Sequence, residues 1–225
     1  CRVADRFAQY PQYEIYKMDV GLKRTPRTYG VKAEEGPEGY EESMGSLKTF
    51  FKNVEGDVLF VVSGCGMISG ASLRILEQLK KCKLHVLYVF SDPELIGETA
   101  RLQQRLTFNV FQEYARSGVF EKVVLVDNTR LEEILGDLPV IGFYEQLNEL
   151  LVPTMHMFNV LSHSESVMDN ISPPHQISRI VSYGLVDFES GEEKMFFDLD
   201  NVREKVYYYA INEEKLKTQG NIHKK

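Results

Sequence analysis

The sequence predicts an α/β protein with a mainly parallel sheet flanked by helices, because three apolar runs alternate with segments of helical spacing. The runs are DVLFVV (57–62), LHVLYVF (84–90) and EKVVLVDN (121–128). Their nearly continuous apolar character is typical of strands buried on both faces, and the alternation with helices is typical of a parallel sheet. Ligands of such sheets bind beyond the carboxyl ends of the strands, so the residues that follow each run are the candidates for a site.

Length and composition exclude several classes of protein. The chain has 225 residues, is 43% hydrophobic and carries a net charge of −7, which is globular composition and argues against general nucleic-acid binding. Three cysteines (Cys1, Cys65 and Cys82) cannot build a disulfide framework, and no pair has zinc-ligand spacing. No apolar run reaches the length that spans a membrane. We therefore expect a cytoplasmic protein without a membrane or nucleic-acid partner and without a metal site built from protein ligands.

The segment before the first apolar run contains a predicted helix over 1–9 and a predicted strand, YEIYKMDV, over 13–20. Residues 21–42 are polar and rich in Gly, Pro and Glu, so we expect a loop. Residues 43–54 have helical spacing. Because the chain opens inside a predicted helix and without Met, we expect the native N-terminus to lie upstream.

The remaining helices are predicted over 73–81, 95–117, 129–135 and 140–162. The last is a long central helix in which Pro153 predicts a kink. A polar linker follows at 164–176. Residues 177–200 then predict a β-hairpin that turns at Ser190-Gly191, residues 206–211 predict a strand, and a charged helix or tail ends the chain. The sequence thus predicts one domain over 1–163, a linker over 164–176 and the start of a smaller β-containing domain over 177–225.

A glycine-rich segment, SGCGMISGAS, directly follows the first apolar run. Gly64, Gly66 and Gly70 allow tight turns and close approach to an anion, and Ser69 and Ser72 carry hydroxyl donors. The positive N-terminus of the next helix also favours an anion. The segment lacks the Lys of a Walker loop and the GxGxxG order of a Rossmann turn. It predicts either a phosphate cradle or a plain strand-to-helix turn, and the sequence leaves both open.

The order of these motifs resembles the GTP-binding domain of the tubulin/FtsZ superfamily over about residues 1–165. The signature loop of that family, GGGTG[ST]G, corresponds to GMISGAS (66–72), in which Gly66, Ser69 and Gly70 agree in kind and four residues depart. The resemblance implies GTP or GDP as ligand, accompanied by Mg²⁺. It assigns the following residues to the nucleotide: Cys1, Asp19, Gly64, Gly66, Ser69, Gly70, Glu98, Arg105, Asn128, Tyr144 and Asn148.

Within the resemblance, Arg105 corresponds to a phosphate-binding arginine and Asn128 to an asparagine that reads guanine or ribose. Tyr144 and Asn148 lie at i and i+4 of the central helix, so that one face can stack on a base and hydrogen-bond to it. The alternative is a half-buried helix with Tyr and Asn at its rim. Cys1 would lie at the edge of an earlier loop, and Asp19 and Glu98 near the ribose or phosphates.

The resemblance also implies a head-to-tail filament in which a loop of one subunit, GxxNxDxxD, completes the GTPase site of the next. The corresponding stretch, SHSESVMDNISPPHQ, lacks this motif, and its candidates for catalysis are Glu165 and Asp169, with Asn170 beside them. A linker without chemistry is the alternative. Two functions remain open: a self-assembling GTP-binding cytoskeletal protein with hydrolysis at the interface, or a structural protein that kept the fold with weak or no hydrolysis. A Rossmann-type enzyme is disfavoured, because the glycines do not follow the first strand.

Overall fold

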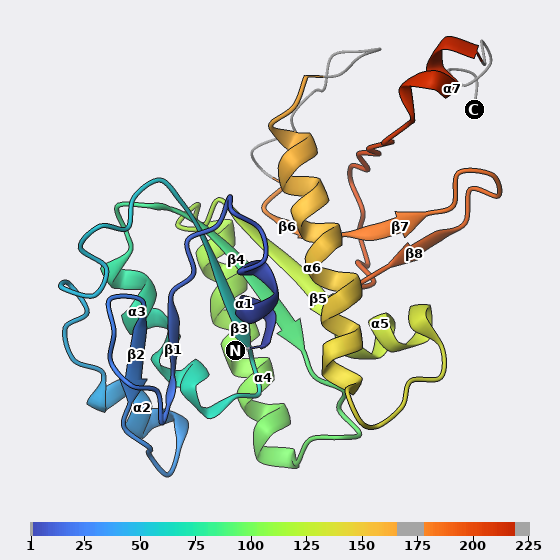
Figure 1. The fold of residues 1–225 in the computed structure, drawn as a ribbon. Helices are drawn as coiled ribbons and strands as arrows, with labels where there is room; N and C mark the ends of the chain where they lie inside the picture. Colours follow the sequence, from blue (N-terminus) through green and yellow to red (C-terminus); the bar gives the residue numbers. More distant parts are fainter. Residues whose placement is uncertain (1, 166–177, 219–225) are drawn as a thin grey trace.

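A four-stranded parallel sheet forms the centre of the fold in the computed structural model, which describes residues 2–165 and 178–218 (Figure 1). Its strands lie in the order β3 (Asp57–Ser63), β4 (Lys83–Phe90), β5 (Lys122–Asp127) and β6 (Ile180–Ser182). Each neighbouring pair is parallel. The three apolar runs thus form β3, β4 and β5, and the predicted α/β class with a mainly parallel sheet is confirmed.

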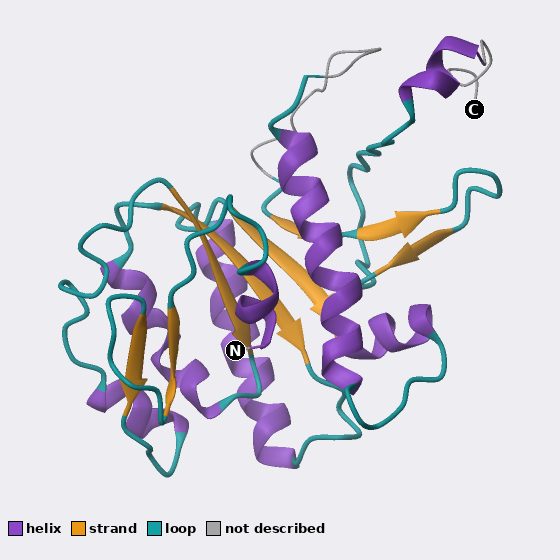
Figure 2. Ribbon diagram, viewed as in Figure 1, coloured by secondary structure: helices purple, strands orange, loops and turns teal. Residues whose placement is uncertain are grey.

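Helices cover both faces of this sheet (Figure 2). Alternate residues of β4 separate the two faces: Val86 packs in one buried cluster with Phe111, and Leu87 packs in a second with Leu151. The helices that contribute to these clusters include α3 (Ser72–Gln78), α4 (Glu98–Arg116), α5 (Asn128–Leu135) and α6 (Phe143–Ser162). A short 3-10 helix, η1 (Met67–Ala71), precedes α3. A sheet buried on both faces requires strands that are apolar throughout, as these are.

The central helix α6 begins at Phe143 rather than at residue 140. Gly142 has a φ of +81°, a left-handed conformation that favours glycine, and Val140 and Ile141 before it are both 92% exposed. The helix continues through Pro153 to Ser162. The Thr154 hydroxyl donates to Leu150 O at 2.8 Å, which satisfies one acceptor in the turn around the proline.

Two predictions for the segment before β3 are wrong. The expected loop over 21–42 contains β2 (Thr28–Val31), which pairs in parallel with β1 (Lys17–Val20), and α2 (Pro37–Ser43). The expected helix over 43–54 is a series of turns. Leu47 and Phe50 there are buried, but Leu47 N donates to the Gln78 side chain at 2.5 Å instead of to a carbonyl one turn earlier. The apolar spacing of this segment therefore predicted correctly that Leu47 and Phe50 are buried, but not the secondary structure that buries them. The predicted N-terminal helix is present as α1 (Arg2–Phe7).

The C-terminal part contains the predicted hairpin over a narrower range. β7 (Gly184–Val186) pairs antiparallel with β8 (Glu193–Met195), and Gly191 has the positive φ of the turn. Residues 206–211 are not a strand, although they lie in the described part of the chain, and the final helix is α7 (Glu213–Thr218). β6, from the predicted second domain, extends the main sheet; the division at 163 and 177 stays a prediction.

No helix among the described residues combines the length and apolar character needed to cross a membrane.

Candidate functional site

The carboxyl ends of β3, β4 and β5 lie at one edge of the sheet, together with the amino-terminal ends of α4 and α6 (Figure 1). Polar side chains connect the ends of the first two strands. Cys65 Sγ lies 3.0 Å from Ser91 Oγ and 3.3 Å from Ser63 Oγ. The glycine-rich segment after β3 therefore starts from a fixed position at this edge.

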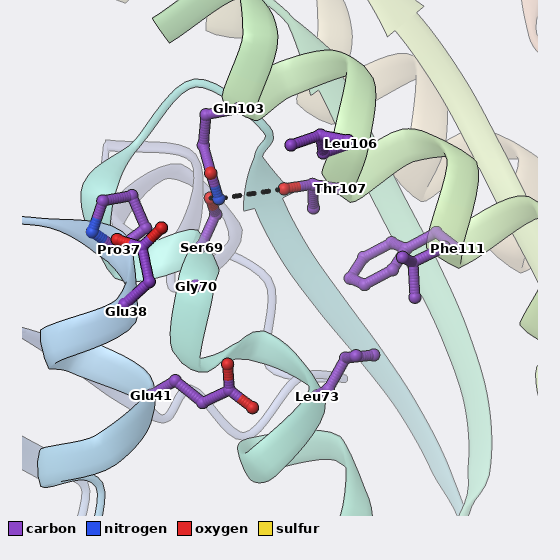
Figure 3. Close-up of a pocket in the computed structure, with 11 residues that line it drawn as sticks. Pro37, Glu38, Glu41, Ser69, Gly70, Leu73, Gln103, Leu106, Thr107 and Phe111 are labelled. Carbon is purple, nitrogen blue, oxygen red and sulfur yellow. Dashed lines mark hydrogen bonds between the residues drawn. The ribbon is translucent and has the colours of Figure 1, made fainter. Parts of the chain in front are cut away.

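Ser69 is part of the internal structure of the glycine-rich segment. Its buried hydroxyl donates to Gly64 O at 3.1 Å and accepts from Gln103 Nε2 at 3.3 Å. Gln103 Nε2 also lies 3.2 Å from Thr107 Oγ1, so one amide group of α4 holds the segment (Figure 3). Gln103 is not predictable as a site residue from the sequence, since an amide at a half-buried helix position gives no distinctive signal.

Packing within the chain requires glycine at two of the three glycine positions of this segment, Gly64 and Gly70. A Cβ atom on residue 64 would overlap the Tyr88 hydroxyl, and one on residue 70 would overlap the backbone of Pro37. Gly66 is different, because the nearest atom to its Cβ position is Ser63 O at 3.4 Å. Of these three glycines, Gly66 is therefore the one whose Cβ position does not overlap another atom of the chain.

Tyr88 and Gln104 fasten α4 to the same edge of the sheet. The buried Tyr88 hydroxyl donates to Gln104 O at 2.6 Å, and Gln104 Oε1 accepts from Ser91 N at 2.9 Å. Burial raises the pKa of Tyr88 well above its usual value, so its phenol stays protonated as a donor. Gln104, which is buried, is a second amide residue that the sequence analysis did not single out.

On α6, the predicted pair Tyr144 and Asn148 differ sharply in burial. Tyr144 is 44% exposed and Asn148 only 9%. The Arg2 guanidinium lies 5.1 Å from the Tyr144 ring centroid, and Arg2 Nε lies 3.3 Å from a Glu145 carboxylate oxygen. The ring therefore has a cation at one face. No hydrogen bond joins the Asn148 side chain to another residue within the ranges 2–165 and 178–218.

The residues after β5 combine a helix cap with an unpaired hydroxyl. The Asp127 carboxylate accepts from Thr129 N at 2.9 Å and caps α5, whose first residue is the half-buried Asn128. The Thr129 Oγ1 atom is buried without a partner in the part of the chain that the structure describes. Thr129 was not among the predicted site residues.

The remaining predicted residues lie at separate places. Arg105 is exposed on α4; with 100° of rotation per residue, it lies on the flank opposite to Gln103, which reaches the glycine-rich segment. Glu98 is exposed in the first turn of α4, and Asp19 lies in β1, where its carboxylate accepts from Val20 N. Glu165 is exposed after α6. Cys1 and Asp169 lie outside the described residues, and the nucleotide roles of all these positions stay predictions.

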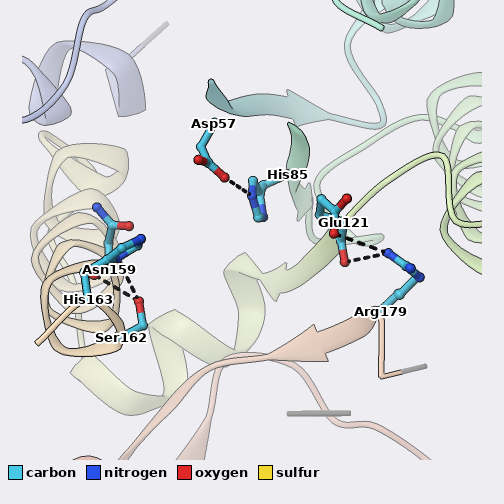
Figure 4. Close-up of polar contacts among 7 residues, drawn as sticks. All are labelled: Asp57, His85, Glu121, Asn159, Ser162, His163 and Arg179. Carbon is cyan, nitrogen blue, oxygen red and sulfur yellow. Dashed lines mark hydrogen bonds and ion pairs between the residues drawn. The ribbon is translucent and has the colours of Figure 1, made fainter. Parts of the chain in front are cut away.

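The histidines make local contacts. His85 Nε2 lies 3.0 Å from Asp57 Oδ1 across β4 and β3, while His163 Nδ1 lies 2.7 Å from Asn159 O on α6 (Figure 4). Figure 4 also shows Arg179 beside Glu121, a link between the starts of β6 and β5. His85 is half-buried at the amino-terminal edge of the sheet. Within the described ranges, no three His, Cys, Asp or Glu side chains form a metal-binding group.

The chain is thus an α/β protein with a mainly parallel sheet. Its structure is similar to that of CetZ from Methanosaeta thermophila strain DSM 6194, with a TM-score of 0.56 and 15% sequence identity. The likeness covers 74% of this chain and 52% of that one, so the chain corresponds to about half of CetZ. At this identity the likeness concerns the fold. No family model and no curated protein sequence matches the chain.

Proposed function

We propose that the chain is a guanine-nucleotide-binding protein of the tubulin/FtsZ type that assembles head to tail. The fold likeness supports this function, as does the placement of the glycine-rich segment and the starts of α5 and α6 near one edge of the sheet. Asn128 is the first residue of α5. In parallel sheets this edge is where ligands bind. GTP or GDP would lie between the glycine-rich segment and α6, with any Mg²⁺ held chiefly by the phosphates.

The observation that carries the proposal is the Asn148 side chain, which forms no hydrogen bond with another described residue and lies one helical turn from the exposed ring of Tyr144. An amide that makes no hydrogen bond within the chain keeps two donors and an acceptor for a ligand. A purine with a carbonyl and an amino group supplies both kinds of partner. An exposed aromatic ring one turn away can stack on the same base.

The test is nucleotide binding by Asn148→Ala, measured by calorimetry with GDP, GTP and ATP. We expect the wild-type chain to prefer GDP and GTP to ATP, and Asn148→Ala to weaken GDP binding about tenfold or more, as the loss of a buried hydrogen-bonding pair requires. The matched control is Asn159→Ala on the same helix, since Asn159 bonds to Tyr13. Equal GDP affinity in Asn148→Ala and wild type would refute the guanine pocket.

A second function, a structural protein that retains the fold without hydrolysis, is favoured by a specific observation. The Ser69 hydroxyl is engaged within the chain, and Gly64 and Gly70 are required by packing. These features would persist without a phosphate ligand. Pelleting with GTP, GDP or no nucleotide, with a parallel assay of released phosphate, separates the two functions. GTP-dependent pelleting coupled to phosphate release supports the GTPase polymer; assembly without nucleotide or phosphate release supports the structural protein.

Hydrolysis in the proposed filament would need a carboxylate that orients water at the γ-phosphate. Glu165 and Asp169 are the proposed candidates on the linker of the neighbouring subunit. If Glu165→Gln and Asp169→Asn both leave phosphate release per assembled subunit unchanged, neither residue has this role.

A further inference from the structure

A small cavity lies beside the glycine-rich segment (Figure 3). Residues of α2, η1, α3 and α4 form its wall. Its volume is about 170 Å³, which is below the roughly 300 Å³ of small-molecule and cofactor sites. The cavity is therefore too small for a nucleotide and has the size of a single side chain. The apolar side chains of Leu73, Leu106 and Phe111 form part of its wall.

The polar atoms at the cavity are mainly acceptors. Glu38 and Glu41 line it from successive turns of α2, at i and i+3 on one helix face. Neither carboxylate has a hydrogen bond or ion pair with any described residue. Gln103 directs its amide nitrogen to Ser69 and Thr107, which leaves its oxygen as a further acceptor. A ligand that fits must therefore bring donors and positive charge.

The charge around the mouth agrees with this requirement. The stretch from Ala33 to Leu47 contains five glutamates and no Lys or Arg. A guanidinium group presents donors in a planar fork that suits two neighbouring carboxylates, and its aliphatic stem can pack on an apolar wall.

An apolar stripe on α4 continues from the cavity along the surface. Leu102, Leu106, Val110 and Tyr114 are spaced four residues apart and are between 38% and 53% exposed. Leu106 and Val110 belong to both the stripe and the cavity wall. Such a stripe matches the apolar face of an amphipathic helix laid along α4.

We propose that the cavity receives an arginine side chain from an amphipathic helix of a different protein, whose apolar residues cover the α4 stripe. The chain's own arginines support a different protein as the source. Arg2, Arg6, Arg27, Arg116, Arg130 and Arg179 each form an ion pair within the chain. Arg24 lies over the Tyr29 ring, and Arg203 lies in the irregular segment after β8. Arg74, Arg101 and Arg105 lie on α3 and α4, which both contribute to the cavity wall.

The first test uses butylguanidinium as probe and methyl NMR of Leu73, Leu106 and Val110 in the full chain. We expect saturable shifts that weaken about fivefold in the double variant Glu38→Gln/Glu41→Gln, as the loss of two exposed ion pairs predicts. The matched control is Glu35→Gln/Glu42→Gln, which neutralises two exposed glutamates of the same segment outside the cavity lining and should bind like wild type. Non-saturable shifts, equal binding of 1-butanol, or equal affinity in Glu38→Gln/Glu41→Gln would overturn the arginine site.

The second test identifies the source of the arginine by sedimentation of the wild-type chain over a range of concentrations without nucleotide. We expect Glu38→Gln/Glu41→Gln and wild type to have the same oligomeric state. If the wild type self-associates and this double variant does not, a second copy occupies the cavity, and the assignment to a different protein is wrong. Neither test depends on guanine-nucleotide binding, so its outcome is separate from that of the proposed function.

Discussion

A Cβ atom on residue 64 would collide with the phenol oxygen of Tyr88, so the loop after β3 and strand β4 pack together only with glycine at this position. Tyr88 is fully buried and donates to Gln104 O, which leaves it no room to withdraw. Gly64, one of the glycines that the sequence assigns to a ligand, therefore has a packing role of its own.

Gly64→Ala should lower the free energy of unfolding by about 1–3 kcal/mol, because overpacking forces buried neighbours to shift. Urea unfolding of the purified chain measures this. The control is Gly97→Ala, since Gly97 has ordinary extended backbone and no atom within 4 Å of its Cβ position. If the two variants are equally stable, the collision with Tyr88 does not constrain residue 64.

Tyr144→Leu should weaken GDP binding about tenfold while leaving stability unchanged. The substitution keeps an apolar side chain but removes the flat ring, and base stacking on such a ring contributes about 1–3 kcal/mol. Tyr144 is exposed enough that its loss costs little in folding. Calorimetric titration measures the affinity, with Tyr209→Leu, another exposed tyrosine, as control. An unchanged Kd in Tyr144→Leu would separate this ring from nucleotide binding.

His156→Ala should release the segment around Tyr10 from α6. The His156 ring stacks on Tyr10 at a centroid distance of 3.8 Å, and its Nδ1 lies 3.2 Å from the Tyr13 hydroxyl. Loss of one ring pair and one hydrogen bond should cost about 1–2 kcal/mol. Hydrogen exchange should show faster exchange at residues 8–13. His163→Ala, at the exposed end of α6, should leave both quantities as in wild type; similar effects of the two variants would contradict this role of His156.

Tyr183→Phe should reduce the loss of stability at alkaline pH. Burial raises the pKa of Tyr183 to about 12 in the folded chain, from a usual value of 10.0. The folded state therefore holds its proton longer than the unfolded state. The contribution of the protonated Tyr183 phenol to the free energy of unfolding is complete below pH 10 and is lost as the pH rises toward 12.

Thermal unfolding between pH 8 and pH 12 measures this contribution. Tyr183→Phe should match wild type near pH 8 and lose stability less steeply above pH 10, since the variant has no phenol to ionise at this position. Tyr209→Phe, which changes an exposed tyrosine, should follow the wild-type curve. Identical curves for Tyr183→Phe and wild type would show that another group, such as the buried Tyr88, accounts for the alkaline loss.

The sequence was sufficient to predict the sheet because its strands have a strong local signal. The runs that form β3, β4 and β5 are apolar on both faces, and no other regular structure of that length buries so many consecutive apolar residues beneath helices on either side. The long helix α6 was also predictable, because its apolar residues recur with helical spacing, but the residue at which it begins was not. Gly142, in the left-handed conformation, decides that start.

Weak local signals explain the errors. Leu47 and Phe50 are spaced like a helix but are buried from turns, because the Gln78 side chain supplies a hydrogen bond to that backbone. The run VYYYAI (206–211) has strong β propensity, yet a strand also needs a neighbour with a free edge, and none of the described strands pairs with it.

The sequence by itself determined the fold class and the order of the strands β3, β4 and β5 with the helices α3 to α6, since both follow from hydrophobic periodicity along this part of the chain. The tertiary structure decided how the individual polar residues are used. It bonds the Ser69 hydroxyl within its own segment, places Gln103 rather than another α4 side chain against Ser69, and leaves the Thr129 hydroxyl buried without a partner among the described residues. These outcomes depend on contacts between residues far apart in the sequence, which periodicity does not encode.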